Sequence, residues 1–220
     1  MAILVFAAHP DDEVLGCGGT IAKYAKEGKE VTTVVFSFGE GSDPTAWTLG
    51  VPISDPVYLT STRAKESLKA SKILGTKEVI FLGLRDRKFA EDIHKKDKII
   101  TEILERYQPE RVFTHCPDDP HPAHRLVANL VKECIDKAKL KQKPKIYTFT
   151  IFSPLRFANR NNPRRYIDIS ETFATKKKAL KYFKTQKQYL DNYYTPLIQF
   201  QNWIDGFKSR CKYAEVFYKW

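Results

Sequence analysis

The chain has 220 residues, of which 42% are apolar, and a formal net charge of +11. This length suits one globular domain, and no window holds the roughly 18 consecutive apolar residues that a membrane-spanning helix needs. The N-terminal apolar run ends at a histidine and two aspartates, unlike a signal peptide, so we expect a soluble protein with a cytoplasmic location.

Strand-like and helix-like patterns alternate through the first two thirds of the chain. The apolar run of residues 3–8 predicts a buried strand, and the apolar spacing of residues 13–26 before Gly28 predicts a helix. The two patterns recur, with strands predicted over 31–36, 79–82, 111–114 and 146–152 and helices over 60–74, 93–107 and 122–139. This alternation predicts a Rossmann-like three-layer α/β/α fold with a mostly parallel sheet.

The last third of the chain is less regular. The patterns predict a short strand over 166–169, helices over 173–190 and 197–207, and a last edge strand over 214–218. Residues 39–56 have little periodicity and contain Trp47, so we expect a flap near the functional site there. We expect a single domain over 1–220, in which residues 153–220 complete a core formed by 1–152.

Neither the basic residues nor the cysteines match a known binding motif. The basic residues gather in segments 137–145, 156–165 and 176–187, outside any helix-turn-helix, zinc-finger or aromatic RNA-binding motif. Solvated basic faces are the favoured explanation and no nucleic-acid partner is expected, although an anionic substrate or a membrane surface would also suit them. The four cysteines include no Cys-x-x-Cys pair, which argues against a disulfide framework and against a thiolate zinc site.

Histidines and carboxylates gather directly after two of the predicted strands, those over 3–8 and 111–114. The residues are His9, Asp11, Asp12, His115, Asp118, Asp119, His121 and His124. Because the carboxyl ends of parallel strands border the crevice in which α/β sheets bind ligands, we expect the two groups to meet. Imidazole and carboxylate are ligand types of catalytic zinc, so the residues predict a metal site or an acid/base site.

Two motifs in these segments resemble those of the LmbE-like / PIG-L superfamily of zinc-dependent N-acetylglucosaminyl deacetylases. The first is Ala8-His9-Pro10-Asp11-Asp12-Glu13, followed by Leu15-Gly16-Cys17-Gly18-Gly19-Thr20, and the second, usually His-Pro-Asp-His, is matched by His121-Pro122-Ala123-His124. Softer matches are Arg63-x-x-Glu66, Asp168-Ile169-Ser170 and Tyr213-Ala214-Glu215-x-Phe217. The resemblance therefore spans nearly the whole chain.

The resemblance implies roles for the residues of the first motif. His9 and Asp12, together with His124, match the ligands of Zn²⁺, although another divalent transition metal could take its place. Asp11 matches the general base that takes a proton from the attacking water. Glu13 has no such role and is interpreted as a helix-start residue.

The second motif and Arg63 carry the remaining implied roles. His121 matches a histidine that, as an imidazolium, would stabilise the oxyanion or protonate the leaving amine. Arg63 matches a substrate-contacting arginine, with a salt bridge to Glu66 on its own helix as the alternative. Ala123 stands where the family has an aspartate that holds the neighbouring histidine. Asp86, Asp118 or Asp119 could replace that aspartate from nearby in space, or His121 could act with a lower pKa as a weaker acid.

The resemblance implies a hydrolase that removes the acetyl group from an N-acetylglucosamine-type sugar and releases acetate and an amine. Two alternatives stay open. One is a zinc amidase that acts on another acyl-amine, such as a thiol conjugate, and the other is a module that binds nucleic acid or an anionic polymer. A lipid-linked substrate at a membrane surface and assembly into a homo-oligomer, a trimer or hexamer, would be in keeping with the family.

Overall fold

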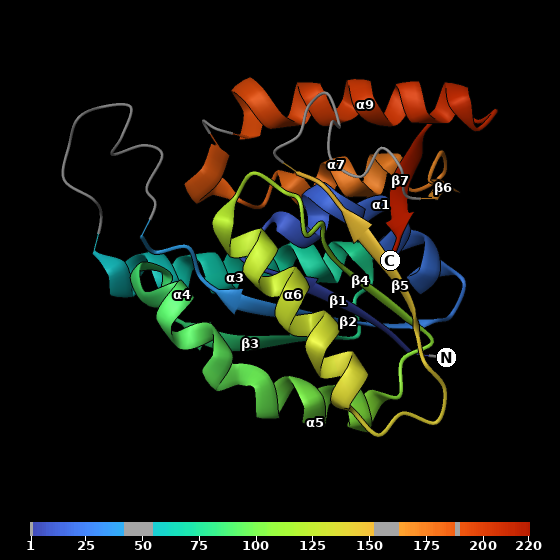
Figure 1. Cartoon of the computed structure of the whole chain (residues 1–220). Coiled ribbons are helices and arrows are strands. Elements are labelled where there is room, and N and C mark those ends of the chain that lie inside the picture. Colours follow the sequence, from blue (N-terminus) through green and yellow to red (C-terminus); the bar gives the residue numbers. More distant parts are fainter. Residues whose placement is uncertain (1, 42–54, 152–162, 188–189) are drawn as a thin grey trace.

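The structure is a computed structural model that describes residues 2–41, 55–151, 163–187 and 190–220. Within these ranges seven strands form one sheet in the order β3-β2-β1-β4-β5-β7-β6 (Figure 1). Their bounds are β1 Ala2–Ala7, β2 Glu30–Ser37, β3 Glu78–Leu84, β4 Arg111–His115, β5 Lys145–Phe149, β6 Arg164–Asp168 and β7 Ala214–Lys219.

The first five strands are parallel, and the chain changes direction across the sheet between β3 and β4. β1, β2 and β3 run outward to one edge, after which the chain returns to place β4 beside β1. A reversal of this kind is the topological switch point at which open α/β sheets bind ligands. The carboxyl ends of β1 and β4 are therefore the expected place for a functional site.

Helices cover both faces of the sheet. One face packs against α1 (Asp12–Lys26), α3 (Pro56–Leu74) and α7 (Phe173–Leu180), and the other against α4 (Phe89–Asp92), α5 (Asp97–Tyr107) and α6 (Pro122–Lys137). Helix α9 (Thr195–Lys208) packs against β7. The predicted three-layer fold with a mostly parallel sheet is thus confirmed. None of the helices in the described ranges is long and apolar enough to cross a membrane.

Three details differ from the sequence-based predictions. The strand predicted at the edge, β7, lies inside the sheet and is antiparallel to both β5 and β6. Its first five residues are buried because α9 and the neighbouring strands cover it, while the edge strand β6 begins with the exposed residues Arg164 and Arg165. The helix predicted over 173–190 ends at Leu180, and most of the predicted flap, with Trp47, lies outside the described residues.

Helix α1 is kinked at Cys17, where φ is −145° and ψ is 23°. The kink interrupts the helical hydrogen bonds, and the N–H groups of Gly19 and Thr20 donate instead to the Glu215 carboxylate of β7, at 3.0 and 2.8 Å. A Cβ on Gly19 would lie 2.6 Å from the Ile169 side chain, so α1 needs glycine to approach the C-terminal segment this closely.

The charge of Glu215 is neutralised by a lysine from a third element. Lys176 of α7 places its Nζ 2.6 Å from the Glu215 carboxylate, and the two side chains are 1% and 2% exposed. The same Nζ donates to the Leu15 carbonyl at 2.9 Å and to Asn202 of α9 at 3.3 Å. We call Lys176, Asn202 and Glu215 the Lys176–Glu215 cluster. It fastens α1 to α7, α9 and β7.

Candidate metal centre

The loop between β1 and α1 makes an abrupt turn at Asp11. Asp11 has φ 104° and ψ −30°, a conformation that costs a non-glycine residue about 1–3 kcal/mol. Its carbonyl accepts hydrogen bonds from the N–H groups of Val14 and Leu15 at 2.9 and 2.8 Å, so the helix starts at once. Asp12 is the first helical residue, and its Oδ2 accepts the N–H of His9 at 2.9 Å. The turn therefore directs His9 and Asp12 at the same point.

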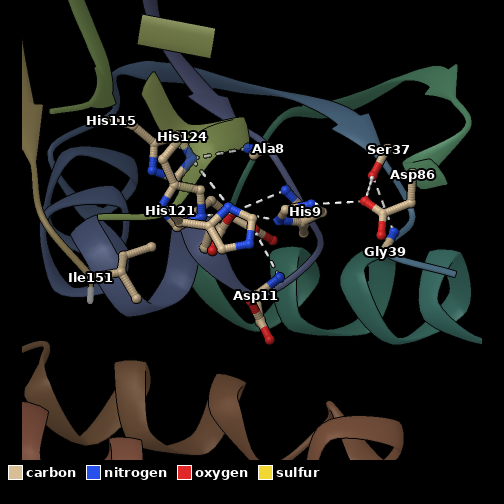
Figure 2. Close-up of polar contacts among 12 residues, drawn as sticks. Ala8, His9, Asp11, Ser37, Gly39, Asp86, His115, His121, His124 and Ile151 are labelled. Carbon is tan, nitrogen blue, oxygen red and sulfur yellow. Dashed lines mark hydrogen bonds and ion pairs between the residues drawn. The ribbon is translucent and has the colours of Figure 1, made fainter. Parts of the chain in front are cut away.

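His9, Asp12 and His124 form a compact group in which one possible ligand atom from each lies within 4.8 Å of the others. Asp12 Oδ2 lies 3.4 Å from His9 Nδ1 and 3.3 Å from His124 Nε2. Ligands of tetrahedral zinc, each about 2.0–2.1 Å from the ion, lie about 3.3 Å from one another. The donor atoms and their spacing therefore fit a zinc ion, and Figure 2 shows the rings of His9, His121 and His124 gathered there.

Each of the two histidines in this group is oriented by a further carboxylate. His9 Nε2 lies 3.1 Å from Asp86 Oδ1, and the same oxygen accepts the hydroxyl of Ser37 at 3.2 Å (Figure 2). His124 Nδ1 lies 3.0 Å from Asp119 Oδ1. Carboxylates in these positions fix the ring orientation of metal-binding histidines. They leave His9 Nδ1 and His124 Nε2 directed at Asp12.

Asp119 contacts both histidines of the second motif. It is fully buried, and besides the His124 ring it accepts the backbone N–H groups of His121 at 2.9 Å and Ile151 at 3.3 Å. Of the three substitutes considered from the sequence, Asp119 is thus the one that holds the second motif, while Asp86 holds His9. A tight turn, in which the N–H of Asp119 donates to the Cys116 carbonyl at 3.1 Å, precedes Pro120 and Pro122 and directs Asp119 toward His124.

The neighbouring carboxylates raise the pKa of both histidines in this group, His9 and His124. Burial disfavours the charged form of His9, but its hydrogen bonds to Asp12 and Asp86 outweigh burial and raise the pKa of His9 to about 10. For His124 burial is likewise outweighed by Asp12 and Asp119, so its pKa is raised. Burial also opposes ionisation of Asp12, yet the charge of His124 holds the pKa of Asp12 well below the usual range. A bound metal ion would replace a proton on each of the two histidines.

The pKa values of the other two histidines of the site, His115 and His121, are lowered. His115 is fully buried, stacks on the His124 ring at 3.9 Å and accepts the Ala8 N–H at Nε2, 2.9 Å away. Burial and the charge of His124 lower the pKa of His115 to about 4. Burial and the charges of His124 and His9 lower the pKa of His121 to about 4 as well. The surroundings of His121 therefore favour its neutral imidazole form over the imidazolium.

Asp11 and Glu13 are two further carboxylates beside the candidate metal ligands. Burial, followed by the charges of Asp12 and Glu13, raises the pKa of Asp11 well above its usual range. Burial raises the pKa of Glu13 to about 7. Glu13 is fully buried, accepts the N–H of Asp11 at 3.1 Å and the hydroxyl of Ser67 at 3.2 Å. Glu13, interpreted from the sequence as a helix-start residue, therefore also holds the strained backbone of Asp11.

Arg63 is more buried than expected of a residue that contacts substrate, with 2% of its surface exposed. Its guanidinium donates to the carbonyls of Phe38, at 3.1 Å, and Gly39, just past β2. The Glu66 carboxylate accepts the N–H and hydroxyl of Thr185 at 3.0 and 2.6 Å. Arg63 therefore holds the segment after β2, and its role toward substrate stays a prediction.

The chain is similar to known proteins that include deacetylases and a hydratase. The sequence pattern of the family GlcNAc-PI de-N-acetylase (PIG-L) matches residues 4–135. A probable N-acetyl-α-D-glucosaminyl L-malate deacetylase of Bacillus cereus is 27% identical over 193 residues, 84% of each chain. The 4-oxalmesaconate hydratase of Pseudomonas putida is 31% identical over 205 residues, 87% of this chain and 76% of that protein. The N,N'-diacetylchitobiose deacetylase of Pyrococcus horikoshii shares the fold, with a TM-score of 0.82 at 24% identity over 100% of this chain and 83% of its own.

Proposed function

Because the chain belongs to the PIG-L family of GlcNAc-PI de-N-acetylases, we propose that it is a zinc-dependent hydrolase that removes the acetyl group from a small N-acetylglucosamine-type sugar or conjugate. The observation that carries this proposal is the group of His9, Asp12 and His124 at the switch point of the sheet. The Bacillus cereus relative, named as a deacetylase of an N-acetylglucosaminyl conjugate, supports the substrate class.

Each of the three proposed ligands is held in place by the protein. Asp12 is fixed by the start of α1, His9 by Asp86, and His124 by Asp119. When bound, zinc would polarise the acetamide carbonyl and lower the pKa of a water molecule to about 7, which makes amide hydrolysis feasible at neutral pH. Two histidines, one carboxylate and an open position form a typical catalytic zinc site.

The residues beside the ligands would move the protons of the reaction. Asp11 is the residue at which the loop turns, and it lies between His9 and Asp12 in the chain, a position that suits a group that takes a proton from the attacking water and later gives it up. The ring of His121 lies 5.3 Å from that of His9 and 4.5 Å from that of His124, measured between centroids. As a neutral imidazole, His121 would donate a hydrogen bond to the carbonyl oxygen as its negative charge develops.

Acetate release measures this function directly. We would strip the purified protein with a chelator, restore one equivalent of zinc, and measure acetate released from N-acetylglucosamine, N,N'-diacetylchitobiose and N-acetyl-α-D-glucosaminyl L-malate. We expect zinc-dependent release that Asp11→Asn reduces about 10²–10⁴-fold while the variant retains its metal. Equal turnover by Asp11→Asn and the parent would show that Asp11 is not the base.

A hydratase is the second candidate. The Pseudomonas putida hydratase is 31% identical to this chain and matches 87% of it, whereas the Bacillus cereus deacetylase is 27% identical. The same metal and base could add water to a carbon–carbon double bond instead of an amide. An assay for the hydration of 4-oxalmesaconate, monitored as the loss of its ultraviolet absorbance, distinguishes the two reactions. Hydration without acetate release from any of the sugars would replace the deacetylase proposal.

A further inference from the structure

A second cavity lies at the opposite end of the sheet from the metal centre. It has a volume of ≈ 380 Å³, and its lining includes Tyr24, Arg111, Lys145, Arg165, Lys219 and Trp220. Arg111 and Lys145 are the first residues of β4 and β5, whereas the metal centre follows the last residues of β1 and β4. Because β7 is antiparallel, its end also reaches this side, near the start of β1 (Figure 1).

The strand register brings four basic side chains to one face of the sheet. Arg111 lies opposite Lys145 in the β4–β5 pair, and Tyr147, two residues after Lys145, lies opposite Lys219 in the β5–β7 pair. Arg165 lies opposite the residue two before Lys219. Since side chains alternate between faces along a strand, these four cations project from the same face of four adjacent strands. Like charges placed directly opposite one another, such as Arg111 and Lys145, destabilise a sheet.

Little in the described ranges offsets this charge. Glu110 forms an ion pair with Arg111, Oε1 to Nη2 at 3.1 Å, and does not line the cavity. The lining in the described part of the chain contains no aspartate or glutamate, and Lys145, Arg165 and Lys219 take part in none of the ion pairs found there. Repulsion among cations that share one cavity is relieved most directly by a bound anion.

The remaining walls of the cavity are aromatic and aliphatic, formed by Tyr24, Tyr147, Trp220, Pro144, Ile146 and Ile167. Tyr24 lies under two cations, with the Arg111 guanidinium 5.5 Å and Lys29 Nζ 4.4 Å from its ring centroid. Trp220 is 38% exposed and offers a free part of its surface to a ligand. A volume of ≈ 380 Å³ falls within the range of about 300–1,000 Å³ of small-molecule sites.

We propose that this cavity binds a small organic phosphate, with the phosphate groups held by Lys145, Arg165 and Lys219 and the organic part against Trp220. A phosphate group supplies several acceptor oxygens and more than one negative charge, which matches cations presented by three different strands. The site would be separate from the metal centre, so its occupancy is independent of the proposed hydrolysis.

Isothermal titration of the full chain with adenosine 5′-diphosphate and with inorganic pyrophosphate tests the proposal. The cavity variant is Lys145→Gln/Arg165→Gln, and the matched control Lys72→Gln/Lys98→Gln removes the same charge from exposed positions on α3 and α5. We expect both ligands to bind the parent and the control alike, and the cavity variant to bind at least about tenfold more weakly. Tighter binding of adenosine 5′-diphosphate than of pyrophosphate would show that the organic part of the ligand contributes to binding.

Acetate release and the melting temperature of the cavity variant complete the test. Both replaced side chains are exposed, so we expect the variant to fold and to keep the zinc-dependent activity of the parent. An equal loss of binding in the control variant would show that the ligands respond to general surface charge and would overturn the proposal. So would the absence of binding to the parent at millimolar ligand.

Discussion

Helix α1 carries two buried polar clusters, the candidate metal centre at its start and the Lys176–Glu215 cluster at its kink, and their charges are balanced differently. In the Lys176–Glu215 cluster the ammonium group meets a carboxylate, a carbonyl and an amide oxygen, and the carboxylate accepts two backbone N–H groups. In the metal centre, carboxylates adjoin one another at Asp11, Asp12 and Glu13, and Asp11 has a strained backbone. A cluster whose charges are matched internally holds the fold, whereas one with adjacent like charges and strain is organised for a ligand.

Replacing Asp12 should break this difference most strongly. Asp12→Ala removes the oxygen that both histidines face, so we expect the loss of bound zinc and a fall in acetate release of about a thousandfold or more. Elemental analysis of the purified variant and an acetate assay measure the two effects. A variant that kept one zinc per chain would remove Asp12 from the ligand set.

Glu215→Gln should disrupt the Lys176–Glu215 cluster, and it should lower stability while leaving activity unchanged. The substitution leaves the Lys176 ammonium buried without its carboxylate, which we expect to lower the free energy of unfolding by about 3–5 kcal/mol, measured by urea denaturation without zinc. Turnover per folded molecule should be unchanged. The exposed pair Lys98–Glu102 provides the control, since Glu102→Gln should cost less than about 1 kcal/mol. Equal losses in the two variants would contradict the structural role of the buried pair.

Asp119→Asn tests the orientation of a ligand instead of the ligand itself. Because Asp119 accepts from the His124 ring, we expect zinc affinity to fall about 10–100-fold, measured by competition with a chromophoric chelator. The neighbouring Asp118 is exposed, so Asp118→Asn is a matched control that should bind zinc like the parent. Similar affinities for both variants would show that Asp119 does not support His124.

Asp11→Gly should separate the cost of the strained backbone at Asp11 from the proposed catalytic role of its carboxylate. Glycine adopts φ 104° without the cost that aspartate bears, so the variant should gain about 1 kcal/mol of unfolding free energy in the metal-free protein while losing activity. Asp11→Ala loses the same carboxylate but keeps a Cβ in the strained conformation, and it should gain less stability than the glycine variant. If alanine and glycine are equally stabilising, like-charge repulsion and not the backbone is the source of the cost.

The sequence predicted the alternating α/β order and the meeting of the two groups of histidines and carboxylates, because both depend on local patterns and on the parallel sheet they imply. The choice of His9, Asp12 and His124 within these groups came from the family resemblance. The place of β7 was missed, since a buried strand has the same apolar pattern whether it lies at an edge or inside. Asp86 was named only as a substitute near the second motif, because its flanking arginines resemble a solvated loop and its contact with His9 crosses 77 residues. Contacts across such distances are set by the packing of the sheet.

The cap that Glu215 places on the kink of α1 has a consequence for the order of folding during synthesis. Gly19 leaves the ribosome long before Glu215, which follows it by 196 residues. Until β7 has been made, the N–H groups of Gly19 and Thr20 lack the carboxylate that accepts them in the folded protein. We therefore expect the second half of α1 to become stable only after the last strand has docked, late in synthesis.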